Sequence, residues 1–367
     1  MKFVLFSDLH LDTAFAWANA DPALPRRRRR ALRDTLSRII ELTVAERADA
    51  LLCAGDLYEQ ERYTSETANF LRTSFEVLHP IPVYLAPGNH DWYGPASIYR
   101  QVEWSPNVTV FDEDQLSPVT LADGLTLWGA AHRAPANTDG FLDRFKVDRG
   151  GVHLALFHGS ERGLLEIQER GKAPHAPFAA RQIEEVGLAH AFVGHFHRPR
   201  DAANYTYPGN PDPLTFGEDG ERGAVIVQVD DRGNVTRERR AVAVTRVHDL
   251  EVDVTGSVSE QDVRQRIVDS TSGLTGVARV TLKGDLDPAV TLRTRELADA
   301  APWMDGLLVR LGAVLPAYDL DAVAAEQTVR GRFVREVRAS NLDDETRRLV
   351  LLTGLRAFDG RSDLDVS

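Results

Sequence analysis

Short apolar runs, each bounded by polar or glycine-rich turns, recur through the first half of the chain and are typical of buried strands. Five of them are KFVLF at 2–6, ADALLCA at 48–54, PIPVYLA at 80–86, GVHLALF at 151–157 and LAHAFV at 188–193. Residues 25–48 have apolar positions at helical spacing, and residues 64–78 predict a second helix that ends before Pro80. Strand and helix in alternation favour a layered α/β core over a helical bundle.

The pattern changes after His197. The turn cluster TYPGNP leads into GAVIVQVD and then, through a turn, into another strand, and these should close the core at about residue 245. Between about 250 and 315, alternating strand and helix patterns predict a small α+β unit, and a final helix follows with Asn341 as N-cap and Gly360 as stop. The 367 residues are therefore expected to divide into 1–245, 246–315 and 316–367.

Each of the five predicted strands is followed closely by side chains that can bind a metal ion. In chain order these are Asp8 and His10, Asp56, Asn89 and His90, His158, and His195 and His197. Because the carboxyl ends of successive strands meet at one edge of an α/β sheet, we expect these side chains to converge there. Oxygen and imidazole ligands without cysteine suit two hard or borderline divalent ions and argue against a structural zinc.

Chance is the simpler explanation of any single motif, since an isolated DxH or HxH pair is common. The GNHD motif at 88–91 is more specific, because its glycine permits a tight turn from which three polar side chains emerge together. All five motifs follow a strand in order, which chance does not explain. The other histidines lack this context and are expected to be structural: His79, His132, His153, His175, His190 and His248.

Composition limits the kind of protein further. The start of the chain lacks the pattern of a secretory signal, no apolar stretch reaches the roughly 20 residues of a membrane span, and the single cysteine, Cys53, lies in an apolar run. A cytoplasmic protein without disulfides or membrane contact is expected. The net charge of −12 argues against binding nucleic acid through the overall field. That argument is weakened because two bound divalent ions would return about four positive charges locally.

The order DxH, GD, GNHD, H and GHxH resembles the calcineurin-like metallophosphoesterase superfamily over residues 1 to about 245. More narrowly, SDLHLD, GDLYE, PGNHDWY and YPGNPDPLTFGEDGERGAVIVQV are similar to the SbcD-type (Mre-like) DNA-repair exonucleases. The resemblance implies a layered β-sandwich flanked by helices as the nuclease domain at 1–245, a small α+β capping domain at 246–315 and a helical segment at 316–367. It also implies Mn²⁺ as the metal, and DNA and an SbcC-type coiled-coil ATPase as partners; a homodimer is left open.

Carried over by position, the resemblance implies two ion positions bridged by Asp56: a first position formed by Asp8, His10 and His197, and a second formed by Asn89, His158 and His195. Ions about 3.5 to 4 Å apart need a shared carboxylate and can deprotonate a water between them, and that hydroxide would attack phosphorus in line. His90 would protonate or position the leaving oxygen, and Asp91 would orient His90. Both are therefore expected to be catalytic residues and not ligands.

Three features leave alternatives open. Some archaeal relatives carry a phosphate-contacting histidine where this chain has Glu59, and an ionised carboxylate cannot make that contact. The run Arg26 to Arg30 either grips backbone phosphates or is a solvated helix start. Leu349, Leu352 and Leu355 either dock a partner or pack against the cap.

Two other functions compete with a DNA nuclease. The first is a phosphomonoesterase or small-nucleotide phosphodiesterase of the same superfamily, which has no obvious need for about 120 residues beyond the core. The second is a non-catalytic scaffold on a phosphoesterase fold, which predicts missing ligands, and none is missing.

Overall fold

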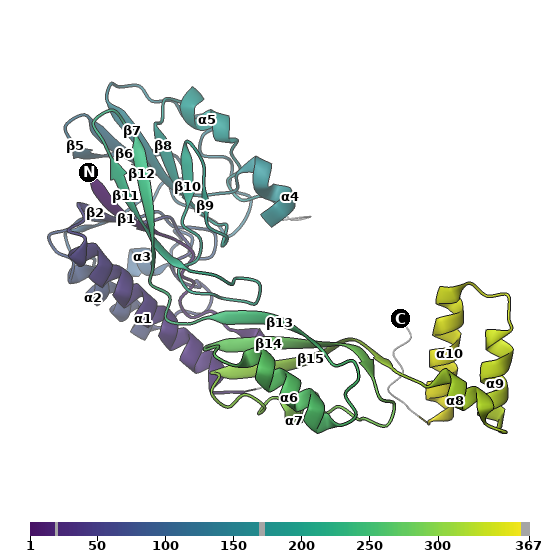
Figure 1. Ribbon diagram of the computed structural model, residues 1–367. Helices are drawn as coiled ribbons and strands as arrows, with labels where there is room; N and C mark the ends of the chain where they lie inside the picture. Colours follow the sequence, from purple (N-terminus) through teal and green to yellow (C-terminus); the bar gives the residue numbers. More distant parts are fainter. Residues whose placement is uncertain (19–20, 169–172, 361–367) are drawn as a thin grey trace. The chain divides into compact units, whose positions relative to one another are not determined.

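The computed structural model describes residues 1–18, 21–168 and 173–360, and the chain divides into two compact units, Met1–Val247 and His248–Ser367. The first unit contains two six-stranded sheets, and a three-stranded sheet followed by helices forms the rest (Figure 1). This is the layered α/β architecture that the alternation of strand and helix patterns predicts. No helix among these described residues is both long and apolar enough to span a membrane.

The first sheet has the strand order β12-β11-β1-β2-β3-β4. Its strands are β1 Lys2–Phe6, β2 Ala50–Cys53, β3 Val83–Leu85, β4 Val108–Val110, β11 Gly223–Val229 and β12 Val235–Ala241. Strands β1 to β4 are parallel, whereas β11 and β12 are each antiparallel to their neighbours. The parallel strands therefore all direct their carboxyl ends to the same edge.

The second sheet has the order β5-β6-β7-β8-β10-β9. Its strands are β5 Ser117–Ala122, β6 Leu125–Gly129, β7 Val152–His158, β8 His190–Gly194, β9 Arg200–Asp201 and β10 Tyr205–Tyr207. Strands β6, β7, β8 and β10 are parallel, and antiparallel strands form both edges. The carboxyl ends of β7 and β8 thus also lie side by side.

The core of the first unit lies between these two sheets. Alternate residues of a strand face opposite sides, so Phe3 and Leu52 of the first sheet pack in one buried cluster with Leu154 and Phe192 of the second. The outer faces carry helices α1 Leu24–Ala45, α2 Ser65–Glu76 and α5 Ala180–Glu185, with α1 and α2 on one side of the layers and α5 on the other (Figure 1). Short helices α3 Ile98–Gln101 and α4 Leu165–Gln168 lie in connections.

The two long helices confirm the sequence-based expectation, and each begins as its residues dictate. Helix α1 has Pro25 in its first turn, where the missing N–H leaves no hydrogen bond unmade. Helix α2 is capped by Thr64, whose side chain accepts a hydrogen bond from the backbone N–H of Thr67. The buried face of α1 repeats at helical spacing through Leu32, Leu36, Ile39 and Ile40.

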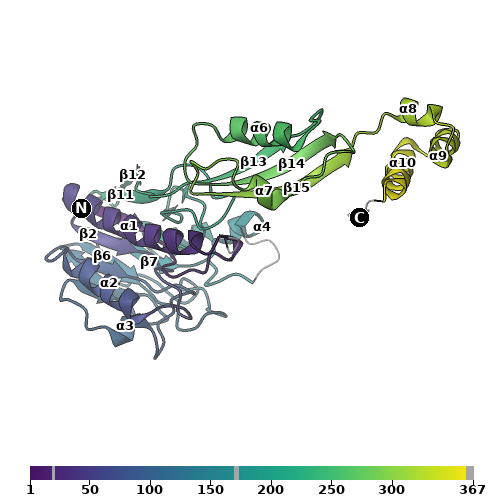
Figure 2. The same cartoon turned by 90° about the horizontal axis from the view of Figure 1, so that it is seen from below.

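The second unit contains a three-stranded sheet, with β13 Val247–Asp253 beginning at the boundary, β14 Val277–Leu286 and β15 Gly306–Pro316. Helices α6 Glu260–Thr271 and α7 Thr294–Leu297 lie against this sheet (Figure 2). Helices α8 Leu320–Ala325, α9 Val329–Arg338 and α10 Asp344–Phe358 share a separate apolar cluster.

The N-cap of α10 is Asp343 and not the predicted Asn341. The Asp343 side chain accepts from the backbone N–H of Thr346, and an aspartate at this position also favours the positive end of the helix dipole. Of the three leucines considered for docking, Leu355 is fully buried within the helical cluster, whereas Leu349 is 54% exposed.

Candidate metal centre

The predicted ligands come from strand ends of both sheets, which corrects the expectation of one sheet edge. Asp8 and His10 follow β1, Asp56 follows β2, and Asn89 follows β3 in the first sheet. His158 ends β7, and His195 and His197 follow β8 in the second. The side chains still converge, because the carboxyl ends of the two sets of strands meet at one end of the sandwich.

The backbone at these strand ends adopts an unusual conformation. Asp8, His10, Asp56 and His195 have φ values of 56°, 51°, 52° and 111°, a region that non-glycine residues rarely occupy. Hydrogen bonds between the first two loops hold it: the backbone N–H of Asp8 donates to Gly55 at 2.9 Å and that of His10 donates to Asp56 at 3.0 Å. Such strained residues persist where the surroundings fix them, and they concentrate at functional sites.

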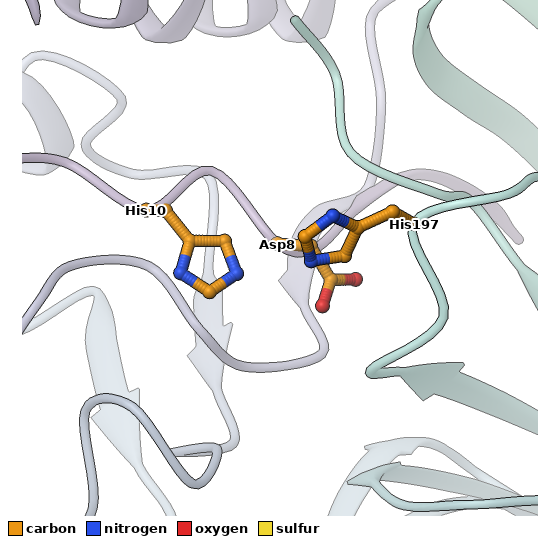
Figure 3. Close-up of side chains that lie close together, drawn as sticks. All are labelled: Asp8, His10 and His197. Atoms are coloured by element: carbon orange, nitrogen blue, oxygen red, sulfur yellow. The ribbon is translucent and has the colours of Figure 1, made fainter. Parts of the chain in front are cut away.

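The three side chains that the resemblance assigns to the first ion position lie close together. Ligand atoms of Asp8, His10 and His197 all lie within 4.8 Å of one another, and Figure 3 shows the three side chains gathered around a common point. The Asp8 carboxylate accepts hydrogen bonds from the backbone N–H of His195 at 3.0 Å and from the hydroxyl of Ser7. These donors fix the carboxylate without occupying all of its acceptor capacity.

Both imidazoles of the first position are oriented by carboxylates. His10 Nδ1 lies 2.8 Å from Glu59 Oε1, and His197 Nδ1 lies 2.7 Å from Glu218 Oε1. A carboxylate accepts from N–H, so the proton sits on Nδ1 and leaves Nε2 with a lone pair in the neutral ring.

The residues fit a metal ion on one observation in particular. His10 Nε2 is buried and has no hydrogen-bond partner among the described residues, although Asp56 Oδ2 lies 3.6 Å away. A buried lone pair without a partner is costly, and a cation at this point would satisfy it.

The second ion position surrounds His158 Nε2. This atom lies 3.1 Å from Asn89 Oδ1, 3.2 Å from His195 Nδ1 and 3.2 Å from Asp56 Oδ2. The opposite ring atom, His158 Nδ1, lies 2.9 Å from the carbonyl oxygen of Ala54, which fixes the ring and directs Nε2 into the cluster. A Cβ atom at Gly55 would lie 2.7 Å from His158 Nδ1, so glycine is required beside this ring.

Asp56 lies between the two positions. Its carboxylate lies within 4.8 Å of ring nitrogens of His10 and His90 in one group and of His158 and His195 in another. Its Oδ1 accepts from the backbone N–H of His90 at 2.8 Å. Burial opposes ionisation, but His158, His90 and His10 outweigh it and lower the pKa of Asp56 well below its usual range. Burial likewise disfavours the charged form of His158, yet Asp56 raises its pKa to about 9. A bound ion would therefore displace a proton from this pair.

The sequence predicts a catalytic pair in which Asp91 orients the ring of His90. In the structure, Glu59 makes that contact. Asp91 accepts from the backbone N–H groups of Asp56, Leu57 and Gly88 and from the hydroxyl of Tyr99, and no described hydrogen bond joins it to His90. Its role here is to fix the loops after β2 and β3.

Glu59 instead joins the two functional histidines. Its Oε2 lies 3.0 Å from His90 Nδ1 while its Oε1 engages His10, and the two rings meet edge to face with centroids 4.7 Å apart. Burial lowers the pKa of His90, but the hydrogen bond to Glu59 and the charge of Asp56 outweigh it and raise the pKa to about 9. Against the opposing effect of burial, the same two histidines lower the pKa of Glu59 to about 2.

Comparison with known proteins agrees with this geometry. Residues 1–199, more than half of the chain, match the calcineurin-like phosphoesterase family. The chain belongs to this family. Membership implies a metal-dependent hydrolase of phosphate esters.

Individual relatives are distant. The chain is 26% identical over 377 residues to the "Uncharacterized metallophosphoesterase YhaO" of Bacillus subtilis (strain 168), with 98% of this chain and 85% of that protein covered. It is 25% identical over 303 residues to the "DNA double-strand break repair protein Mre11" of Methanopyrus kandleri, with 73% of this chain and 62% of that protein covered. The crystal structure of TT1561 of Thermus thermophilus shares 12% identity and a TM-score of 0.37, covering 65% of this chain and 98% of that one.

The phosphoesterase centre opens into a cleft of about 980 Å³ in the first unit. Four carboxylates, Asp56, Glu59, Glu218 and Asp219, line it together with the guanidinium groups of Arg198 and Arg222. Arg222 is used within the fold, since it donates to the carbonyl oxygens of His197 at 2.6 Å and Glu218 at 2.8 Å. Arg198 is exposed, and no hydrogen bond or ion pair of its guanidinium is found in the described part of the chain.

The arginine run at the start of α1 divides into two kinds of residue. Arg28 is 2% exposed, lies 3.2 Å from Asp212 and lies over the ring of Phe15, so it is structural. Arg26 and Arg30 are exposed and remain candidates for phosphate contact.

Two histidines that were expected to have only a structural role, His132 and His175, lie behind the metal centre. His132 Nε2 lies 2.8 Å from the carbonyl oxygen of His158. Burial is the main effect that lowers the pKa of His132 to about 3, so its ring is neutral. The His175 ring lies 5.2 Å from that of His195. Sequence reasoning missed the roles of Glu59 and Glu218, although the spacing of Glu59 three residues after Asp56 is a local signal.

Proposed function

We propose that this phosphoesterase is a two-metal DNA nuclease, an SbcD-like exonuclease or endonuclease of DNA repair that uses Mn²⁺ and hydrolyses phosphodiester bonds. The observation that carries the proposal is that Asp56 belongs to two groups of possible ligands, one with His10 and His90 and one with His158 and His195, with the atoms of each group within 4.8 Å of one another. The choice of DNA is supported by the similarity to the protein named Mre11.

Two divalent ions at these positions would lower the pKa of a water and neutralise charge that develops on the phosphate. The chain's own residues supply the rest. Because Glu59 engages Nδ1 of His90, the other ring nitrogen remains for the substrate. The His90 side chain is 46% exposed, and in the ion-free chain Glu59 and Asp56 raise its pKa to about 9 against the effect of burial. It is therefore suited to donate a proton to the leaving oxygen.

Arg198 is the residue that we assign to the substrate phosphate. It follows the ligand His197 directly and contributes an exposed positive charge to a cleft that otherwise carries an excess of carboxylates. An exposed contact of this kind is worth about 1 kcal/mol, or about fivefold in affinity.

The second unit is proposed to act as a capping domain at 246–315 and a helical segment at 316–367 that docks an SbcC-type ATPase. The exposed Leu349 on α10 is available for such docking, whereas the buried Leu355 is not. A cytoplasmic location is part of the same proposal.

The test uses labelled linear DNA and bis-p-nitrophenyl phosphate, each with Mn²⁺ and with a chelator. We expect Mn²⁺-dependent cleavage of both, with Arg198→Ala raising the KM for DNA about fivefold at nearly unchanged kcat. Arg200→Ala is the matched control, because Arg200 is exposed two residues further on and does not line the cleft. Cleavage of the small diester without any cleavage of DNA would favour the small-substrate phosphodiesterase.

A further inference from the structure

The two ion positions differ in the groups that stand behind His10 and His197 in the first and behind His158 in the second. In the first position, His10 is supported by Glu59 and His197 by Glu218. Both carboxylates are largely buried, with side chains 18% and 12% exposed. A carboxylate behind a ligating histidine raises the basicity of the ring and holds its orientation.

Glu218 is held in place independently of His197. Its Oε2 accepts from Asn210 Nδ2 at 2.7 Å and from the backbone N–H groups of Leu214 at 2.7 Å and Thr215 at 3.2 Å. Its Oε1 is thereby fixed at the imidazole. The carboxylate is a preorganised part of the cleft wall, so ion binding need not order it.

The second position has fewer carboxylates among its assigned ligands and behind His158. The group behind His158 is the neutral carbonyl of Ala54, and Asn89 contributes a neutral amide. Among the ligands assigned to this position, the shared Asp56 is the one carboxylate. The first position also shares Asp56 and has Asp8 as a second carboxylate ligand. Two further carboxylates, Glu59 and Glu218, are hydrogen-bonded to its histidines. Coulomb attraction to a divalent cation therefore favours the first position.

We infer that the two positions are unequal: the first binds its ion more tightly and fills first, and Glu59 and Glu218 are the positioning residues that make it so. The inference rests on the two-ion part of the proposed function and is independent of whether the substrate is DNA.

The test is a titration of the full, ion-free chain with Mn²⁺, followed by equilibrium dialysis with elemental analysis and by electron paramagnetic resonance. We expect one tight and one weak binding phase, with the spectrum of isolated Mn²⁺ appearing first and that of a coupled pair later. Glu218→Gln should weaken the tight phase by roughly 10- to 100-fold and leave the weak phase in place.

Three variants complete the design. Asn89→Ala should remove the weak phase and leave the tight one. Glu59→Gln should repeat the effect of Glu218→Gln from the opposite side of the centre, so the inference stays testable if one variant folds poorly. Glu221→Gln is the matched control, because Glu221 is an exposed carboxylate on the same loop and should change neither phase.

The outcomes separate the inference from the function on which it rests. Two ions bound with equal affinity, or Glu218→Gln and Asn89→Ala weakening the same phase, would overturn the inequality and leave a two-ion centre standing. Failure to bind Mn²⁺ at saturation would overturn the two-ion function itself.

Discussion

The link between Glu59 and His90 gives the sharpest test of how this centre works. Glu59 accepts from His10 and His90 with its two carboxylate oxygens, at 2.8 and 3.0 Å. Glu59→Ala removes both contacts. A hydrogen bond to a charged group is worth about 1.5–3 kcal/mol, and the 46% exposure of the His90 side chain favours the lower end. Loss of about 1.5 kcal/mol from the transition state corresponds to about tenfold in turnover.

The assay is a double-mutant cycle on kcat. It is run at saturating Mn²⁺, so that the first ion position stays filled even if Glu59→Ala weakens its affinity. His90→Ala alone should lower turnover by roughly 10²- to 10⁴-fold. In that background Glu59→Ala should cost less than about twofold, because the group through which it acts is gone. Glu218→Gln is the control, since Glu218 engages His197 and should have the same effect in both backgrounds. If Glu59→Ala slowed both backgrounds equally, Glu59 would not act through His90.

Other variants test the remaining assignments. Asp56→Ala should lower ion occupancy at both positions, and elemental analysis that still finds two ions at moderate Mn²⁺ would contradict the bridging role. His158→Ala should lose metal first, whereas His90→Ala should keep its metal and lose turnover. His190 is buried, and burial together with the charge of Arg237 lowers its pKa to about 3. Between about pH 6.5 and 3, His190 is therefore protonated in the unfolded chain and neutral in the folded chain. The contribution of His190 to the free energy of unfolding is therefore complete above about pH 6.5 and falls by up to about 1.4 kcal/mol per pH unit below it. Urea unfolding of His190→Asn at several pH values should show a free energy of unfolding that falls less steeply with decreasing pH, by that amount. An unchanged pH dependence would contradict the assignment.

The strands and ligands that the sequence predicted share one property, which is that their signals are local. An apolar run followed directly by Asp8 or His158 identifies both the strand and the side chain at its end, because a parallel strand buried on both faces must be apolar until it emerges. Strands β4 and β5 escaped prediction because they are half-exposed edge elements without a continuous apolar run. Strand β6 was also not predicted, although all five of its residues are buried. The same lack of a local pattern explains why two sheets were not distinguished from one.

The hydrogen-bond partners of the ligands were harder to foresee. Asp91 neighbours His90 in sequence, which suggested that it orients the ring, but adjacent residues in this turn point apart and Asp91 faces buried backbone N–H groups. Glu59 reaches His10 because the loops after β1 and β2 are bridged at Leu11 and Tyr58. It reaches His90 because the next residue, Gln60, donates its backbone N–H to the carbonyl oxygen of His90 at 2.9 Å. Glu218 and His197 are 21 residues apart, with strands β9 and β10 between them, and no spacing in the sequence predicts their contact.

The charge of the cleft connects the ion positions to the choice of substrate. Four carboxylates line it against two guanidinium groups and the protonated His90, so the ion-free cleft keeps an excess of carboxylates, which disfavours a phosphate chain. Two divalent ions would reverse that excess, and they would do so at the point where the scissile phosphate must lie. The carboxylates that hold the ions thus also keep anions out until the ions are bound. An acidic protein with a net charge of −12 can act on a polyanion on this basis, because the local field at the occupied centre, and not the overall field, decides where phosphate binds.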